Sequence, residues 1–212
     1  MYKSSHSIQD HLTKHASIYF FMIILFLIGI IFGAIIVNSM NFVQKEDLFF
    51  YLDRFFGQIV DGTTVSKQEM LKNTFFYHFS YLMLLFVLGL SIIGLPIIWI
   101  LLFVKGLVVG FSVGFFVNQM GWQGLIFATA SIAPQNLIVI PTYLIAGSLA
   151  MIFSLSLLQK LFSRKMHQPI IQPFVRYMSL FISLIGLAVI ASMIEAFISN
   201  EAMQIVINWI YK

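Results

Sequence analysis

Charged side chains are scarce in this sequence of 212 residues. They make up only 9% of the chain, whereas hydrophobic residues make up 60%. A soluble domain carries about 25% charged residues, and so few polar side chains could not cover this much apolar surface. The composition therefore excludes a soluble enzyme, a nucleic-acid-binding domain and a disordered chain.

Cysteine is absent altogether. The chain therefore forms no disulfide, holds no metal through a thiolate and has no cysteine nucleophile. A chain without cysteine is compatible with an oxidising or a reducing compartment. The formal net charge of +4 is small, so the position of the basic residues is more informative than their excess.

Long apolar runs dominate the sequence. A membrane-spanning helix needs about 20 apolar residues, and the chain has enough for five or six. We predict an all-α, polytopic membrane protein that forms a single membrane domain over residues 1–212 and contacts the lipid bilayer. The predicted spans cover about 18–37, 74–95, 106–120, 136–158 and 177–198.

Basic residues orient these spans. The linker 159–176 contains basic but no acidic residues, which places it in the cytoplasm together with the amino-terminal segment and Lys105. The loop 38–73 and the tail then face outward, so five spans leave the two termini in opposite compartments. The uncharged stretch between Asn73 and Lys105 is too long for one straight span, and Gly94 and Pro96 predict a bend in it.

The outer loop contains an amphipathic pattern. Its apolar residues recur at helical spacing and predict a helix that either adheres to the membrane or binds a partner. This docking face comprises Phe49, Leu52, Phe55, Phe56 and Ile59. Ser66 and Glu69 have the spacing of a capping box, which predicts the next helix start. The tail stripe Met203, Val206, Ile207 and Ile210 predicts a helix on the membrane surface.

Glycine recurs every four residues at Gly106, Gly110 and Gly114. Such spacing lets two membrane helices approach closely, either within the chain or between two copies in a homo-oligomer. The same segment matches Gly-x-Ser-x-Gly around Ser112, but that string forms a nucleophile elbow only in a strand–turn–helix. We predict no catalytic residue, no cofactor and no metal site; the pair His11 and His15 lacks a third ligand.

Two ionisable residues, His78 and Glu195, lie inside or at the edge of the predicted spans. They are either a functional intramembrane pair or are exposed at the membrane interface. Together with the proline-containing stretch 132–141, predicted to be broken, they support an alternative function as a small channel or transporter.

The chain resembles the stage II sporulation protein M family. The resemblance covers almost the whole length and rests on the order of the spans, on Lys105–Phe111 and on Ile132–Pro141 continuing to Gly147. Relatives usually carry a His-Gly pair after Pro134 and a Glu near Val139. This chain has Gln135, Asn136 and Val139 there, which favours a scaffold over a transporter.

The resemblance implies a function in spore formation. It implies a non-enzymatic membrane scaffold in a protein complex at the sporulation septum and in the engulfing mother-cell membrane. The implied partners are the stage II sporulation proteins D and P, which are peptidoglycan hydrolases, and the implied process is peptidoglycan remodelling during forespore engulfment.

Overall fold

The computed structural model describes residues 13–60, 66–162, 171–199, 201–203 and 205–206. Within these residues the regular secondary structure is entirely helical, so the predicted fold class is confirmed. The helices are α2 (Ala16–Ser39), α3 (Phe42–Val60), α4 (Lys67–Gly89), α5 (Gly94–Ser131), α6 (Ala133–Phe162) and α7 (Ile171–Ile194), followed by the π-helix η1 (Glu195–Ser199).

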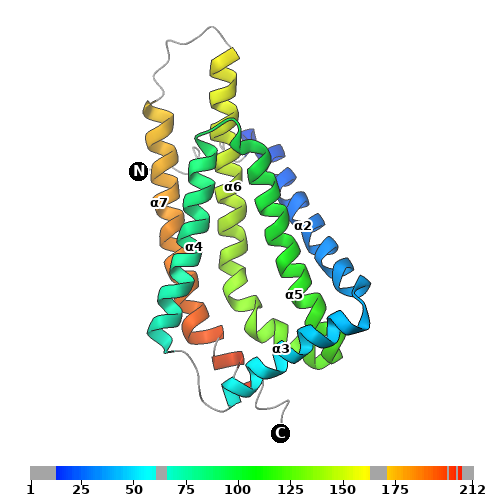
Figure 1. Cartoon of the computed structure of the whole chain (residues 1–212). Coiled ribbons are helices and arrows are strands. Elements are labelled where there is room, and N and C mark those ends of the chain that lie inside the picture. The colour runs from blue at the N-terminus through cyan, green and yellow to red at the C-terminus, as the bar shows by residue number, and fades with distance from the viewer. Residues whose placement is uncertain (1–12, 61–65, 163–170, 200, 204, 207–212) are drawn as a thin grey trace.

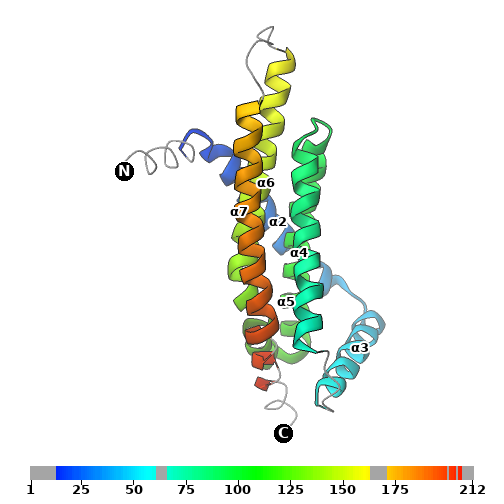
Figure 2. The same ribbon diagram turned by 90° about the vertical axis from the view of Figure 1, so that its left-hand side faces the viewer.

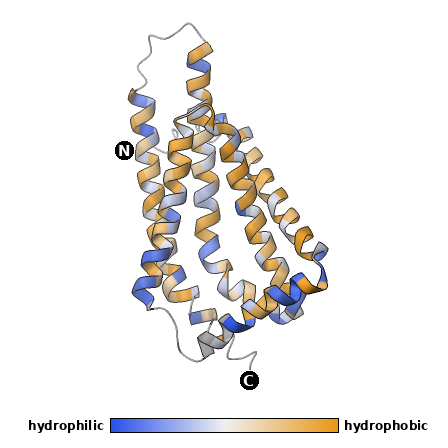
Figure 3. Cartoon of the chain, viewed as in Figure 1, coloured by the Kyte–Doolittle hydropathy of each residue, from blue (hydrophilic) through white to orange (hydrophobic). Residues whose placement is uncertain are grey.

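Five helices are long and apolar enough to cross a membrane: 16–39, 67–89, 94–131, 133–162 and 171–203. They run side by side, whereas α3 lies across one end of the bundle (Figure 1, Figure 2). Hydrophobic residues cover the length of the five spans, and hydrophilic ones concentrate on α3 and near the helix ends (Figure 3). The chain is therefore a multi-pass membrane protein.

The two ends of the bundle differ in charge. Lys160 in the last turn of α6 and Arg176 near the start of α7 lie at the end opposite α3. His15 precedes α2 at that same end, where partial burial and then the charge of Lys14 lower its pKa. This arrangement agrees with the basic-residue pattern that assigned α3 to the outside.

The chain reverses direction between α4 and α5, where a bent continuation was predicted. The turn Leu90–Ile93 separates two neighbouring helices. The hydroxyl of Ser154 on α6 donates to the Ser91 carbonyl at 2.8 Å, which satisfies one polar group of the turn. Gly94 is required here, because a Cβ at this position would overlap the Leu88 carbonyl oxygen.

The third span is consequently longer than the predicted 106–120. It begins at Gly94, and Lys105 lies 11 residues further on (105 − 94), which is about 16 Å along a helix. Since the hydrocarbon core is about 30 Å thick, Lys105 lies near its middle instead of at the cytoplasmic end. The prediction treated this charge as a span boundary.

The far end of α5 contains a second reversal. Gly121 has φ 55° and ψ −128° inside the helix, a conformation that favours glycine. Residues 122–131 then fold back on α5, since the rings of Phe116 and Phe127 lie 4.7 Å apart, centroid to centroid. The predicted broken stretch 132–141 lies instead almost wholly within α6, which runs through Pro141.

The glycines of α5 pack against α2. A Cβ at Gly106 would overlap the Phe26 carbonyl oxygen, and one at Gly110 would overlap that of Ile30. Gly114 is less tight, because its Cβ would lie 3.3 Å from the Ala34 Cα.

Helix α2 contributes glycines of its own to this contact. A Cβ at Gly29 would overlap the carbonyl oxygen of Phe103, and one at Gly33 that of Leu107. The absence of side chains on both helices brings the two backbones into direct contact. This glycine face is thus occupied within a single chain.

Helix α3 covers the end of the bundle with one side. Leu52 packs against the buried Phe127, as do Met203 and Val206 from the tail. Ile207 and Ile210 of the predicted tail stripe lie outside the described residues. The next helix begins as predicted, since the Ser66 hydroxyl accepts a hydrogen bond from the Glu69 amide at 3.2 Å.

Candidate intramembrane polar site

A half-buried lysine of α5 lies among three tyrosines of α4 and α6. The Lys105 ammonium donates to the Tyr77 hydroxyl at 3.2 Å. It also lies 4.8, 5.2 and 5.8 Å from the ring centroids of Tyr77, Tyr143 and Tyr81. Cation–π attraction of this kind compensates a positive charge where water is scarce. Tyr81 in turn donates to the Leu101 carbonyl at 3.0 Å.

Tyr143 connects this lysine to a buried histidine. The Tyr143 hydroxyl lies 2.6 Å from Nδ1 of His78, which is only 5% exposed. Either atom can supply the proton, depending on the histidine tautomer. His78 therefore lies well inside the protein, and interfacial exposure does not describe it.

The second nitrogen of His78 faces a carboxylate. Nε2 lies 3.5 Å from Oε2 of Glu195, and Oε1 of Glu195 accepts a hydrogen bond from Thr74 at 3.3 Å. Glu195 is the first residue of the π-helix η1, and such turns often occur at functional sites. The structure thus brings together the two ionisable residues that the sequence singled out.

Beside Glu195 is a cavity of about 320 Å³ between α3, α4, α5, α6 and the end of α7. Its polar lining consists of Ser112, Ser131, Gln135, Glu195 and Ser199. The first residues of the stretch 132–141 therefore line the same cavity as Glu195. Pro96, where the sequence predicts a bend, lies near the opposite end of α5.

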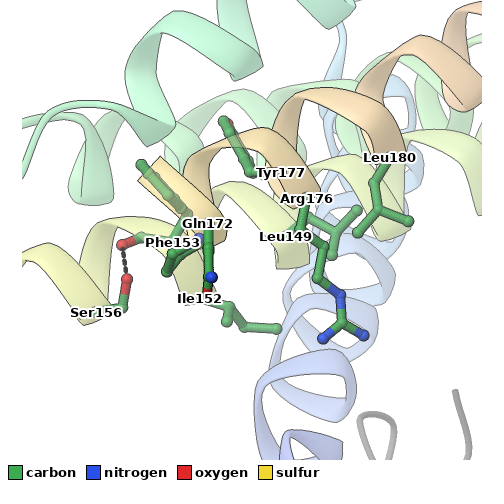
Figure 4. A pocket seen from close by; sticks show the side chains of 9 residues that line it. Leu149, Ile152, Phe153, Ser156, Gln172, Arg176, Tyr177 and Leu180 are labelled. Carbon is green, nitrogen blue, oxygen red and sulfur yellow. Dashed lines mark hydrogen bonds between the residues drawn. The ribbon is translucent and has the colours of Figure 1, made fainter. Parts of the chain in front are cut away.

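A larger groove of about 460 Å³ lies between α6 and α7 on the side of the basic end. Figure 4 shows Arg176 and Gln172 among its lining residues, together with the stacked rings of Phe153 and Tyr177, whose centroids are 4.4 Å apart. The Ser156 hydroxyl is satisfied by the Phe153 carbonyl at 2.6 Å. This groove is mostly apolar and contains no buried orphan polar atom.

Sequence reasoning missed most of the residues around the polar site. It considered Lys105 mainly as a topology signal and did not consider the tyrosines. The spacing of Tyr77 and Tyr81 by four residues, on the helix that carries His78, was an available signal. No sequence signal pointed to Ser131 or Ser199, because a serine in an apolar helix usually makes a hydrogen bond to the backbone of its own helix.

Of the predicted docking face, the structure describes the side chains of Phe49 and Leu52 only. Phe49 is exposed, whereas Leu52 is partly buried. The side chains of Phe55, Phe56 and Ile59 lie outside those described. A different set of aromatic residues on α3 is exposed, as discussed below.

These features define a class: a helical, multi-pass membrane protein with a buried polar site and a helix lying across one end. The model of the stage II sporulation protein M family matches residues 22–200. The chain therefore belongs to this family, and family membership implies a membrane protein of sporulation engulfment. Among curated proteins and solved structures, no match was found.

Proposed function

We propose that the chain is a non-enzymatic membrane scaffold that holds peptidoglycan hydrolases at the sporulation septum during engulfment. The partners proposed are the stage II sporulation proteins D and P. Family membership supports a role in the engulfment machinery. The observation that carries the scaffold proposal is the exposed side of α3.

Helix α3 has one covered and one exposed side. Lys45, Leu48 and Leu52 are partly buried. On the exposed side, Phe50 and Tyr51 are 63% and 68% exposed, and their rings meet edge to face at 6.1 Å.

We refer to Phe42, Phe49, Phe50 and Tyr51 as the outer aromatic patch; all four are exposed. Charged residues of the same helix, among them Glu46, Asp53 and Arg54, are interspersed with them in the sequence. Exposed apolar residues that lie together are typical of a protein-interaction surface, and aromatic residues are enriched in such surfaces.

The location of the outer aromatic patch suits a scaffold. The positive-inside pattern assigns α3 to the side of the membrane that faces the cell wall. Two hydrolases bound to one platform are confined to a thin layer next to their substrate, which raises their effective concentration. This function needs no catalytic residue in the chain itself.

The experiment is co-purification of the two hydrolases with the chain from detergent-solubilised sporulating cells. The double variant Phe50→Ser, Tyr51→Ser should lose about tenfold or more of the recovered hydrolases, because interface aromatics dominate binding energy. A control is Phe162→Ser, an aromatic residue that is 81% exposed at the opposite end of the bundle. Undiminished recovery with the double variant still in the membrane fraction would refute the proposal.

A further inference from the structure

Buried polar atoms without a partner gather around one cavity. Among the described residues, five side chains contain a buried nitrogen or oxygen that makes no hydrogen bond. Three of them belong to Ser131, Gln135 and Ser199, which are lining residues of the cavity next to Glu195. Ser199 is itself only 4% exposed. Orphan buried atoms are costly and rare, so their concentration at one cavity indicates a ligand.

The atoms offered to such a ligand are oxygens. The orphan atoms are the hydroxyl oxygens of Ser131 and Ser199 and the carbonyl oxygen of Gln135. The hydroxyl of Ser112 and the carboxylate of Glu195 complete the polar lining. Hydroxyl, amide carbonyl and carboxylate oxygens are the donors that hard cations prefer.

The charge next to the cavity favours a single positive charge. Glu195 is the one acidic residue of the lining. When the Tyr143 hydroxyl donates to Nδ1 of His78, the imidazole is neutral and its Nε2–H points toward Glu195. The imidazole then offers Glu195 a hydrogen-bond donor but no positive charge, while the contacts of Lys105 are with tyrosines.

The Glu195 carboxylate is 21% exposed and lies 3.5 Å from His78; where the imidazole is neutral, this partly buried group has no positive partner, which is costly in a low-dielectric interior. A monovalent cation in the cavity would balance it and satisfy the orphan oxygens at the same time. A divalent ion would leave an excess positive charge, and its sites usually supply several carboxylates.

We propose that the cavity lined by Ser112, Ser131, Gln135, Glu195 and Ser199 binds a monovalent metal cation, Na⁺ or K⁺. The π-helix contributes both Glu195 and Ser199, its first and last residues, to this site. Leu52 of α3 and Met203 of the tail are also in its lining and form its apolar part at the outer end. The proposal goes beyond the scaffold function, because the outer aromatic patch does not contribute to this cavity.

The test uses the full chain purified in detergent micelles in a choline buffer. Binding of radioactive ²²Na⁺ and, as a K⁺ substitute, ⁸⁶Rb⁺ is measured by scintillation proximity. Saturable binding of either ion, displaced by the unlabelled ion but not by choline, is expected. A rise in melting temperature on replacing choline by the bound ion should accompany it, since a ligand of the folded state stabilises that state.

Variants locate the ion. Glu195→Gln and Ser199→Ala should each weaken binding by about tenfold or more, because each removes an oxygen that contacts a charged ligand. The matched control is Ser148→Ala, which removes another buried orphan hydroxyl that does not line the cavity. Its binding should equal that of the unmodified chain.

Two results would overturn the proposal. The first is no saturable binding of either ion by monodisperse unmodified protein, which would leave water as the occupant. The second is unchanged binding in Ser199→Ala and Glu195→Gln. Circular dichroism checks that each variant is folded. If Glu195→Gln does not fold, the binding measured for Ser199→Ala decides the question. Neither result affects hydrolase co-purification, so the two proposals fail independently.

Discussion

The Tyr143 hydroxyl on α6 lies 2.6 Å from Nδ1 of His78 on α4. This contact joins two parts of one polar network: the aromatic rings around Lys105 on one side, and the pair of His78 with Glu195 on the other. Helices α4, α5 and α6 therefore meet at a single tyrosine, and His78 connects it to η1. Removing the hydroxyl oxygen of Tyr143 tests the importance of this contact.

Tyr143→Phe keeps the ring and removes that oxygen. His78 then loses its partner at Nδ1 while Nε2 already makes no hydrogen bond. We expect a loss of about 1–3 kcal/mol in the free energy of unfolding, the usual result of leaving a buried polar atom unpaired. Unfolding in micelles followed by circular dichroism measures it. Tyr51→Phe, at an exposed position, is the control and should leave stability unchanged; equal stability of both variants would contradict the role of the contact.

Lys105→Met tests whether the half-buried positive charge stabilises the fold. Methionine has a similar length and is apolar, and replacing a buried charge by an apolar residue is often neutral or stabilising. The melting temperature of Lys105→Met should therefore be equal or higher. Lys105→Glu should lower the melting temperature, because a carboxylate would lie against the negative ring faces of Tyr77, Tyr81 and Tyr143. A strong loss of stability in Lys105→Met would show that the ammonium itself is needed.

Gly110→Ala and Gly186→Ala are the same substitution in two environments. A Cβ at Gly110 would overlap the Ile30 carbonyl oxygen, whereas at Gly186 it would meet nothing within 4 Å. Forcing α2 and α5 apart should cost about 1–3 kcal/mol. Gly186→Ala should be neutral or gain about 0.5–1 kcal/mol, because alanine favours the helix over glycine. Thermal unfolding of both variants in the same detergent decides, and equal stabilities would contradict the close contact.

The five-span topology can be tested directly because the chain has no cysteine. Single cysteines are introduced at Tyr51 on exposed α3 and at Lys160 near the end of α6. A membrane-impermeant maleimide should label Tyr51→Cys in intact cells, and Lys160→Cys only after permeabilisation, because basic ends stay in the cytoplasm. Labelling of both positions in intact cells would contradict an opposite placement of the two ends.

The number of spans was predictable because apolar length alone determines it. Each long helix exceeds the thickness of the hydrocarbon core, and Ser66 with Glu69 was recognised as a helix start from local chemistry alone. The start of α5 was not predictable in the same way. The turn at Leu90–Ile93 contains no charge, and one of its carbonyls is satisfied by Ser154, which is far away in sequence.

The sequence did not predict the whole polar site, because the start of the third span was misplaced. With the third span starting after Lys105, this lysine belonged to the cytoplasmic surface and His78 lay near the other one. Starting α5 at Gly94 moves Lys105 to the middle of the span, next to Tyr77 and Tyr143. Which serines remain unpaired, such as Ser131 and Ser199, depends on helix packing that no local pattern encodes.

The glycine contact between α2 and α5 has a consequence for how the chain is made. Helix α2 is apolar all around, so it can stay in the bilayer by itself while α3 and α4 are still being synthesised. Its partner in space emerges from the ribosome only later and must find it by lateral diffusion. We therefore expect the first span, supplied as an independent polypeptide, to join the remaining four spans and complete the bundle.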